Sequence, residues 1–306
     1  MTGFGSFHPM VLFLYYILVV GCTMVSMHPV LAGISLVGGF LLYGAQNGWR
    51  KLFSELGFSI GLFLMLAVTN PMFVHNGETV LFFLNDNPVT LEAILYGMVS
   101  STVLIGVLLW CQCYSRLLTT DKFLYLFGRL IPKLGLILSM AFRFIPLFRL
   151  QIGKINQSQK TMGLYTSDSV TDRIGGGLRV FDSLISWSLE NSVDTADAMI
   201  ARGYGLPGRT NFSLFRFRRR DGLMLGVMGL LSLLTLAGFL SGGYAFYYYP
   251  TVAGLRRDGL AWAFYVAAAG FFWLPGLYEI GEQIMWRKRT AKIGKIREKS
   301  HGIAEG

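Results

Sequence analysis

The sequence predicts an all-α polytopic membrane protein with about six transmembrane helices, two long crossing cytoplasmic helices and a short amphipathic helix. Of the 306 residues, 53% are hydrophobic and only 14% are charged, whereas soluble domains average about 25% charged residues. The apolar residues also gather in six stretches, each long enough to cross a hydrocarbon core that takes about 20 residues. Together these observations place the chain in a lipid bilayer.

The six apolar stretches form a group of four and a group of two. The predicted spans are residues 9–27, 29–45, 56–74, 91–113, 223–247 and 260–280. After the third span, Asn76-Gly77 lies between apolar residues 72–74 and 79–83. Both residues of this dipeptide tolerate positive φ, so it predicts a small β-hairpin. An irregular loop is the alternative.

The basic residues predict the orientation. Residues 112–221 contain 16 Lys and Arg against 8 Asp and Glu, which accounts for +8 of the net charge of +10. Basic loops stay in the cytoplasm, so we expect both termini there, although Arg256-Arg257 would then lie outside. A high isoelectric point can also indicate nucleic-acid binding, but the apolar stretches favour a membrane and no nucleic acid. The expected regions are 1–114 with four spans, 115–221 in the cytoplasm, 222–282 with two spans, and a basic cytoplasmic tail, 283–306.

We expect region 115–221 to be too polar to span the membrane. Its residue pattern predicts three helices. Thr120 or Asp121 can cap a short amphipathic helix. Apolar residues recur at helical spacing from 137 to 162, with a kink expected at Pro146 and an end at Gly163. A polar linker over 167–177 precedes the third helix, 178–202, which ends before Gly203.

A narrow stripe of small residues on the third helix predicts close packing against the second, because small residues let helices approach. The stripe consists of Ser188, Ser192, Ala196 and Met199. Arg143, on the second helix, either pairs with an acid across the crossing or extends toward the membrane interface.

Residues 196–205, Ala-Asp-Ala-Met-Ile-Ala-Arg-Gly-Tyr-Gly, resemble the transmembrane (T) component of energy-coupling factor (ECF) transporters, a cobalt- and vitamin-type family of ABC importers. In that family an Ala-Arg-Gly motif ends a cytoplasmic coupling helix. Segments 70–73, 90–93, 142–146 and 208–210 are similar to family members at the same relative places. By this resemblance, Ala201, Arg202 and Gly203 contact a partner ATPase.

Many family members carry a second Ala-Arg-Gly at the end of the earlier coupling helix. Here that place holds Lys160, Thr161, Met162 and Gly163. The glycine is kept and Met162 stands where the arginine would be, so we expect two non-equivalent ATPase sites. Arg202 alone also has a simpler interpretation, since a cation at a helix C-terminus is stabilised by the helix dipole.

The resemblance implies a coupling subunit in a prokaryotic cell membrane. Its partners would be two ABC-type ATPases, or one fused ATPase, and a substrate-binding membrane S component that takes up a vitamin or metal micronutrient. We expect no catalytic residues, cofactor or metal in this chain, since it has no phosphate-binding loop motif and only scattered histidines. A conventional ABC permease, a secondary carrier and a membrane enzyme are the rival functions.

Overall fold

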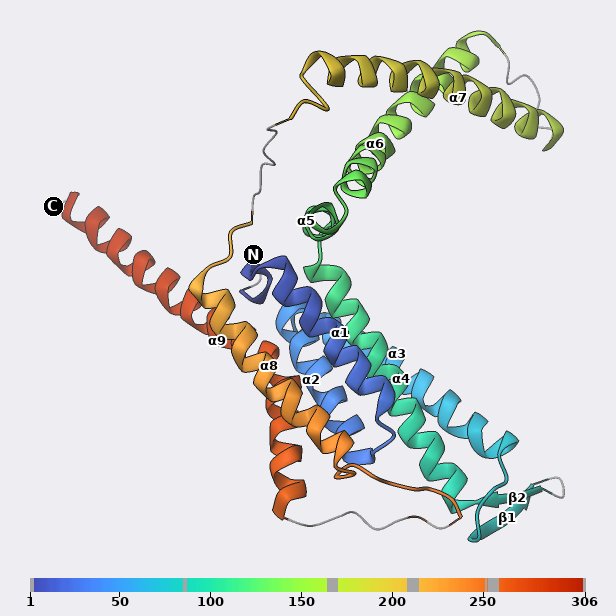
Figure 1. The fold of residues 1–306 in the computed structure, drawn as a ribbon, viewed down its shortest axis with the longest axis vertical. Coiled ribbons are helices and arrows are strands. Elements are labelled where there is room, and N and C mark those ends of the chain that lie inside the picture. Colours follow the sequence, from blue (N-terminus) through green and yellow to red (C-terminus); the bar gives the residue numbers. More distant parts are fainter. Residues whose placement is uncertain are drawn as a thin grey trace. The chain divides into compact units, whose positions relative to one another are not determined.

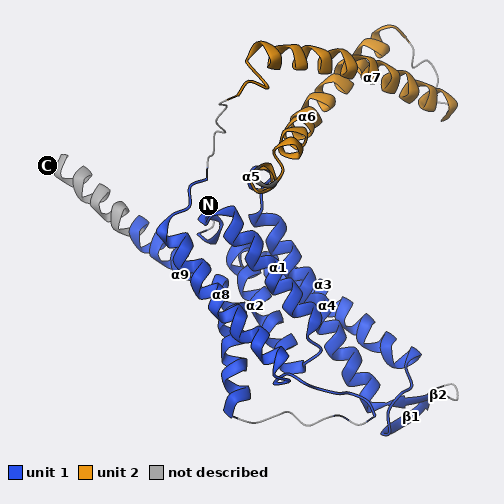
Figure 2. Cartoon of the chain, in the orientation of Figure 1, with its two compact units in different colours: residues 1–122, 215–306 blue, residues 123–214 orange. Residues whose placement is uncertain are grey.

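The computed structural model describes residues 3–84, 87–163, 170–207, 215–250, 252 and 259–304. The chain divides into two compact units (Figure 2). Unit 1 comprises Met1–Lys122 and Phe215–Gly306, and unit 2 comprises Phe123–Leu214. The sequence features at 167–169, 208–210 and 256–257 lie outside the described residues.

Helices make up almost all of the described structure, which confirms the all-α prediction (Figure 1). The elements of unit 1 are η1 (Phe4–Ser6), α1 (Pro9–Val25), α2 (Pro29–Asn47), α3 (Trp49–Phe73), β1 (Val80–Leu84), β2 (Asn87–Thr90), α4 (Leu91–Leu117), α8 (Arg219–Leu240) and α9 (Gly259–Ala304). Helix α5 (Thr120–Leu130) begins at the end of unit 1 and continues into unit 2, which also holds α6 (Pro132–Thr161) and α7 (Val170–Ala201).

Six described helices are long and apolar enough to cross a membrane, but they are not the six that we expected. Helices α2, α3, α4, α8 and α9 overlap five of the predicted spans. Helix α1 has 17 residues and is slightly shorter than the others. The sixth candidate is α6, which lies in region 115–221, the region that we expected to be too polar to span; the length and composition of this helix also satisfy the requirement for a span.

Helix α8 ends earlier than predicted, at Leu240 rather than near 247. Gly242 adopts a positive φ of 67°, and its N–H donates to the carbonyl of Phe239 at 3.2 Å. The N–H of Gly243 donates to the carbonyl of Gly238 at 2.9 Å. This pair of bonds is the glycine-dependent Schellman ending, and it stops the helix within an apolar sequence.

The core of unit 1 forms where α1, α2, α4 and α9 meet. The indole Nε1 of Trp110 on α4 donates to Ser35 Oγ on α2 at 3.0 Å, and Thr23 on α1 shares a hydrogen bond with the same hydroxyl at 2.8 Å. One turn further along α2, a Cβ at Gly38 would lie 2.8 Å from the carbonyl oxygen of Phe272 on α9. The missing side chain at Gly38 thus allows α2 and α9 to pack closely.

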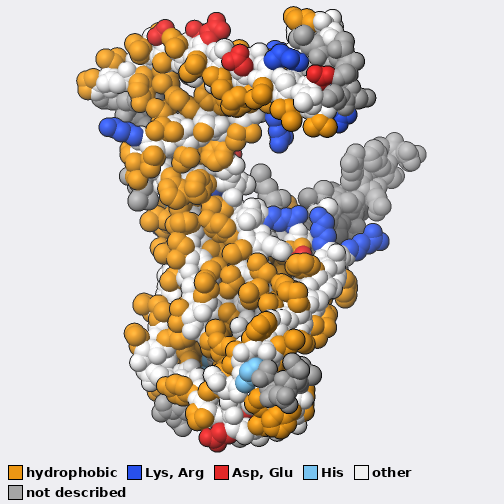
Figure 3. Space-filling view, turned by 90° about the vertical axis from the view of Figure 1, so that its right-hand side faces the viewer, with side chains coloured by type: hydrophobic (Ala, Val, Ile, Leu, Met, Phe, Trp, Pro, Cys, Tyr) orange, Lys and Arg blue, Asp and Glu red, His pale blue; other side chains and the backbone are white. Residues whose placement is uncertain are grey.

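Apolar side chains also cover much of the outside of unit 1 (Figure 3). Within unit 1, helix α3 is the most exposed of the apolar helices. Only 6% of its apolar stretch within residues Arg50–Phe73 is buried, although the sequence there is strongly hydrophobic. Phe58 and Met65 are examples of its large exposed side chains. An apolar helix exposed in this way requires a lipid or protein environment.

The loop between α3 and α4 contains a small hairpin, but it is not the one predicted around Asn76-Gly77. Residues 72–73 belong to the last turn of α3, and the paired antiparallel strands are β1 and β2, with Phe83 opposite Pro88. Asn76-Gly77 lies in the link between α3 and β1 instead. Gly77 has a φ of 141°, and a Cβ there would lie 2.5 Å from Oε2 of Glu92. The dipeptide is therefore used for a close approach rather than for the hairpin turn.

Candidate functional site

Helices α6 and α7 cross in unit 2, as the periodicity predicts (Figure 1). The rings of Phe148 on α6 and Trp187 on α7 meet edge to face, with centroids 6.0 Å apart. Gln159 on α6 and Gly176 and Val180 on α7 are the buried residues of this crossing. The second half of α6 therefore packs against the first half of α7.

Helix α7 begins earlier than the sequence predicts, because Gly175-Gly176-Gly177 lies inside the helix rather than in a linker. Glycine in a helix interior costs about 1 kcal/mol relative to alanine. The burial of Gly176 supplies the compensation, since a residue without a side chain lets the two helix backbones approach. The same crossing explains why a glycine-rich stretch is helical here.

The four residues of the predicted packing stripe on α7 differ in exposure. Ser188 and Met199 are half-buried, whereas Ser192 and Ala196 are exposed. The hydroxyl of Ser192 donates to the carbonyl of Ser188 at 2.6 Å, so it is satisfied by its own helix. The buried contact lies nearer the N-terminus of α7 because the crossing uses Gly176 instead.

Arg143 and Pro146 are both exposed on α6, away from the buried crossing. Helix α6 runs continuously from Pro132 to Thr161 through Pro146. The proline thus removes one helix hydrogen bond without ending the helix.

The end of α7 has the complete geometry of a Schellman motif. The N–H of Tyr204 donates to the carbonyl of Met199 at 3.0 Å, and the N–H of Gly203 donates to that of Ile200 at 2.9 Å. Gly203 adopts a φ of 81°, a conformation that favours glycine. Ala201 is therefore the last helical residue, and Arg202 is the exposed C-cap.

Helix α6 ends in the same way over the residues that the structure describes. Met162 is the C-cap, and Gly163 has a φ of 69° and donates its N–H to the carbonyl of Lys160 at 3.1 Å. The hydroxyl of Thr161 donates to the carbonyl of Gln157 at 3.0 Å. The side chain of Met162 is 72% exposed, and Lys160 is exposed as well. Both predicted motifs therefore lie at exposed helix ends.

A groove of about 480 Å³ adjoins the end of α6, and the sequence analysis did not predict it. Its polar and charged lining comes from both crossing helices. The lining includes Lys154, Ser158 and Met162 of α6 and Arg179, Asp182 and Ser183 of α7. The sequence pattern does not predict that Arg179 and Asp182 of α7 lie near Met162, because they are separated from it along the chain.

Helix α7 also presents a long apolar face that no described residue covers. Its members recur every three or four residues, the spacing of one helix face. They are Val170, Ile174, Leu178, Phe181, Ile185, Leu189 and Val193, all exposed. An acidic residue, Asp194, lies on another face of the same helix. A face of this kind marks a site for a protein or lipid partner.

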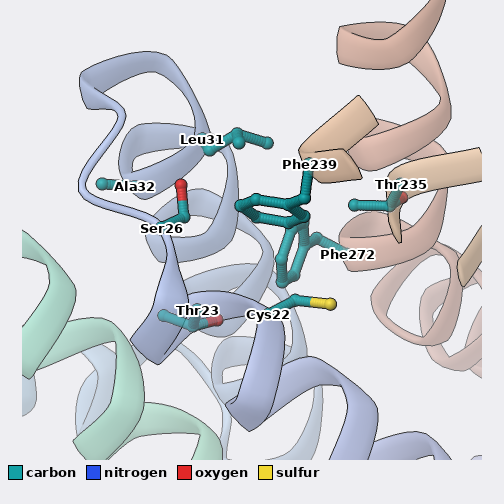
Figure 4. A pocket seen from close by; sticks show the side chains of 8 residues that line it. All are labelled: Cys22, Thr23, Ser26, Leu31, Ala32, Thr235, Phe239 and Phe272. Carbon is teal, nitrogen blue, oxygen red and sulfur yellow. The ribbon is translucent and has the colours of Figure 1, made fainter. Parts of the chain in front are cut away.

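The described part of unit 1 contains a pocket that is closed, unlike the open groove beside α6. Side chains from α1, α2, α8 and α9 close around this pocket, among them Cys22, Phe239 and Phe272 (Figure 4). It has no room for a water molecule. Within the described ranges, no group of three or more His, Cys, Asp or Glu residues is arranged to hold a metal ion.

The apolar helices of unit 1, joined to a unit of crossing amphipathic helices, define a multi-pass membrane protein. The profile of the cobalt transport protein family, CbiQ, matches residues 8–212. This range extends from the start of α1 to beyond the end of α7, so it includes both helix ends. The chain belongs to this family of membrane transport proteins.

Several curated proteins named energy-coupling factor transporter transmembrane protein EcfT are similar to the chain. The Listeria innocua protein is 38% identical over 112 residues, which cover 36% of this chain and 40% of that protein. The Limosilactobacillus fermentum protein is 25% identical over 191 residues, or 61% and 72% of the two chains. The Brevibacillus brevis protein is 28% identical over 213 residues, or 63% and 78%. The chain thus spans about two fifths of the length of the Listeria protein in that match.

Proposed function

We propose that this chain is the membrane-embedded coupling subunit of an ECF-type ABC importer. The main support for this proposal is that α6 and α7 cross and that each ends before a glycine with positive φ. Met162 and Arg202 are exposed at equivalent positions of these two ends. Each end is a rigid tip suited to contact a moving partner. Two ABC-type ATPases, or one fused ATPase, bind these tips, and their motion passes along the helices.

Arginine suits the contact at the α7 tip. Its guanidinium presents a fixed fork of donors that holds a carboxylate bidentately. A buried interface arginine commonly contributes about 2 kcal/mol or more to binding. At the α6 tip the exposed thioether of Met162 fits an apolar groove on the ATPase. The neighbouring groove lined by Lys154 and Arg179 supplies positive charge there.

The apolar face of α7 receives the substrate-binding membrane S component in this proposal. That partner carries the specificity for a vitamin or metal micronutrient, and this chain transmits motion to it. The names of the EcfT relatives and of the cobalt transport family support a micronutrient importer. The chain itself hydrolyses no ATP.

The orientation follows from the charges of unit 1. Lys and Arg side chains gather at one end of this unit (Figure 3). Arg116 lies in the last turn of α4, Lys122 in the first turn of α5 and Arg219 at the start of α8. The hairpin end contains Glu78 and Glu92. Because basic loops remain in the cytoplasm, we place the basic end and both termini inside a prokaryotic cell, with regions 115–221 and 283–306 in the cytoplasm.

Co-purification tests this function. The tagged chain is expressed together with the ABC ATPases and the candidate S component encoded beside it, and the membrane complex is isolated in mild detergent. The proposal predicts that ATPases and S component are retained together. Recovery of the chain without any ATPase would contradict it and favour a secondary carrier.

A further inference from the structure

Residues 3–8, hereafter the 3–8 segment, contact several distant parts of unit 1. Phe4 and Phe7 are almost fully buried, and the ring of Phe4 lies 5.8 Å from that of Tyr15 on α1. The ring of Phe7 lies 5.1 Å from that of Tyr278 on α9. A segment packed in this manner belongs to the core of the unit.

A buried carboxylate on α9 fixes the start of the segment. Glu279 is 1% exposed, and its two oxygens accept the N–H groups of Gly3 at 3.2 Å and Phe4 at 2.7 Å. Gln283 on the next turn donates to the carbonyl of Ala45 on α2 at 2.6 Å. Hydrogen bonds to a buried charged group are among the stronger ones in proteins, so the segment is firmly tied to α9.

The middle of the segment holds the chain where it leaves for unit 2. The ammonium of Lys122, in the first turn of α5, donates to the carbonyl of Gly5 at 2.7 Å and to that of Leu117 at 2.9 Å. Burial lowers the pKa of Lys122. Residues 117–122, hereafter the outgoing connection, are thereby joined to the 3–8 segment.

The end of the segment holds the chain where it returns from unit 2. Asp221 is buried, and its two carboxylate oxygens accept the N–H of His8 at 3.2 Å and that of Arg218 at 2.8 Å. The rings of His8 and Phe217 lie 5.4 Å apart. The guanidinium of Arg220 lies 5.8 Å from the centroid of the Phe7 ring. Residues 215–221 form the incoming connection, and the same short segment holds it.

We propose that the 3–8 segment is a clasp that joins the outgoing and incoming connections to α9, so that a displacement of either connection is transmitted to the other and to the membrane helices. This role rests on the proposed coupling function, since it supplies the path by which motion of unit 2 enters unit 1. Lys122, Asp221 and Glu279 are its positioning residues. They act through the backbone of the segment and contact no proposed partner.

The clasp predicts that a change at one connection loosens the other. The test is hydrogen–deuterium exchange of the full chain in lipid nanodiscs, comparing the native protein with Lys122→Met. We expect exchange to become about tenfold faster in residues 215–221 as well as in the segment itself, the effect of losing a charged hydrogen bond. Confinement of faster exchange to residues 3–8 and 117–122 would overturn the proposal.

A matched control is Arg116→Met. Arg116 lies next to the outgoing connection, and its side chain donates to the carbonyl of Gln46 on α2 at 3.3 Å rather than to a carbonyl of the 3–8 segment. This variant should leave exchange at 215–221 unchanged, and faster exchange there would also count against the clasp. Asp221→Asn is the reciprocal variant and should loosen residues 117–122, which keeps the test decisive if Lys122→Met does not fold.

No ATPase is present in this experiment. Failure of the clasp is therefore distinguishable from failure of the coupling function, which co-purification tests separately.

Discussion

Met162 and Arg202 occupy the same position at the ends of two different helices. Each is the C-cap residue, each is exposed, and each is followed by a glycine with φ near 70–80°, 69° at Gly163 and 81° at Gly203. The backbone is matched, while one side chain is an apolar thioether and the other a cation. Two equivalent tips therefore present different chemistry to their partners.

Non-equivalent tips predict unequal losses when each is truncated. Arg202→Ala removes a bidentate donor and should weaken ATPase binding by about 2 kcal/mol, as for an interface hot spot. Met162→Ala removes mainly apolar area and should weaken it by about 1 kcal/mol. Titration of purified ATPase onto the chain in nanodiscs measures both. Equal losses at the two tips would show that the sites are equivalent.

The positive φ at Gly163 predicts a specific penalty for any side chain there. A Cβ at this position meets no atom within 4 Å, so Gly163→Ala introduces only backbone strain. We expect the helix end to be destabilised by about 1 kcal/mol, measured by hydrogen exchange at residues 158–163. Gly153→Ala, inside α6 with equally open space, is the matched control and should not destabilise it. Equal effects at both positions would argue against the left-handed helix end.

The location of α6 is open to a direct test, because this helix has the length and composition of a span. In a variant whose native cysteines are replaced, Ser158→Cys lies on an exposed part of α6. We expect an impermeant maleimide to label it only after the cells are permeabilised. Glu78→Cys, at the hairpin end, should be labelled on intact cells. Failure of Ser158→Cys to react from either side would place this part of α6 in lipid.

The apolar face of α7 predicts a separable loss of the S component. Leu189→Asp places a charge on this face, and we expect S-component retention to fall by more than about tenfold, because burying an unpaired charge is costly. Binding of the ATPase, at the far end of the helix, should persist. Asp194→Asn, on another face of α7, is the control. Retention of the S component by Leu189→Asp would exclude this face as its docking site.

The sequence predicted the helical class and the helix ends better than it predicted the packing. Glycine after an apolar periodic segment is a local signal, so the ends at Gly163 and Gly203 were predictable. The helical state of 175–177 depends on burial of Gly176 against a distant helix, and the local signal for a linker was misleading. The hairpin turn predicted at Asn76-Gly77 was wrong for the same reason. Gly77 lies so close to Glu92, a residue distant along the chain, that a side chain would not fit there.

The clasp could not be predicted from local patterns at all. The hydrogen bond from Phe4 to Glu279 joins residues 275 positions apart, and that from His8 to Asp221 joins residues 213 apart. Glu279 stands out in the sequence as an acid near the end of an apolar span, but its partners are backbone amides. Backbone donors carry no sequence signal, so only the fold reveals them.

The central claim is that the end of α7 anchors a partner ATPase through Arg202. The most direct test compares ATPase co-purification with the native chain, Arg202→Glu and Arg216→Glu at matched membrane levels. Arg216 is an exposed basic residue before α8 and controls for charge reversal alone. The account predicts that the ATPase is lost with Arg202→Glu and retained with Arg216→Glu. Equal retention by all three proteins would contradict it and would leave Arg202 as the cap of its own helix.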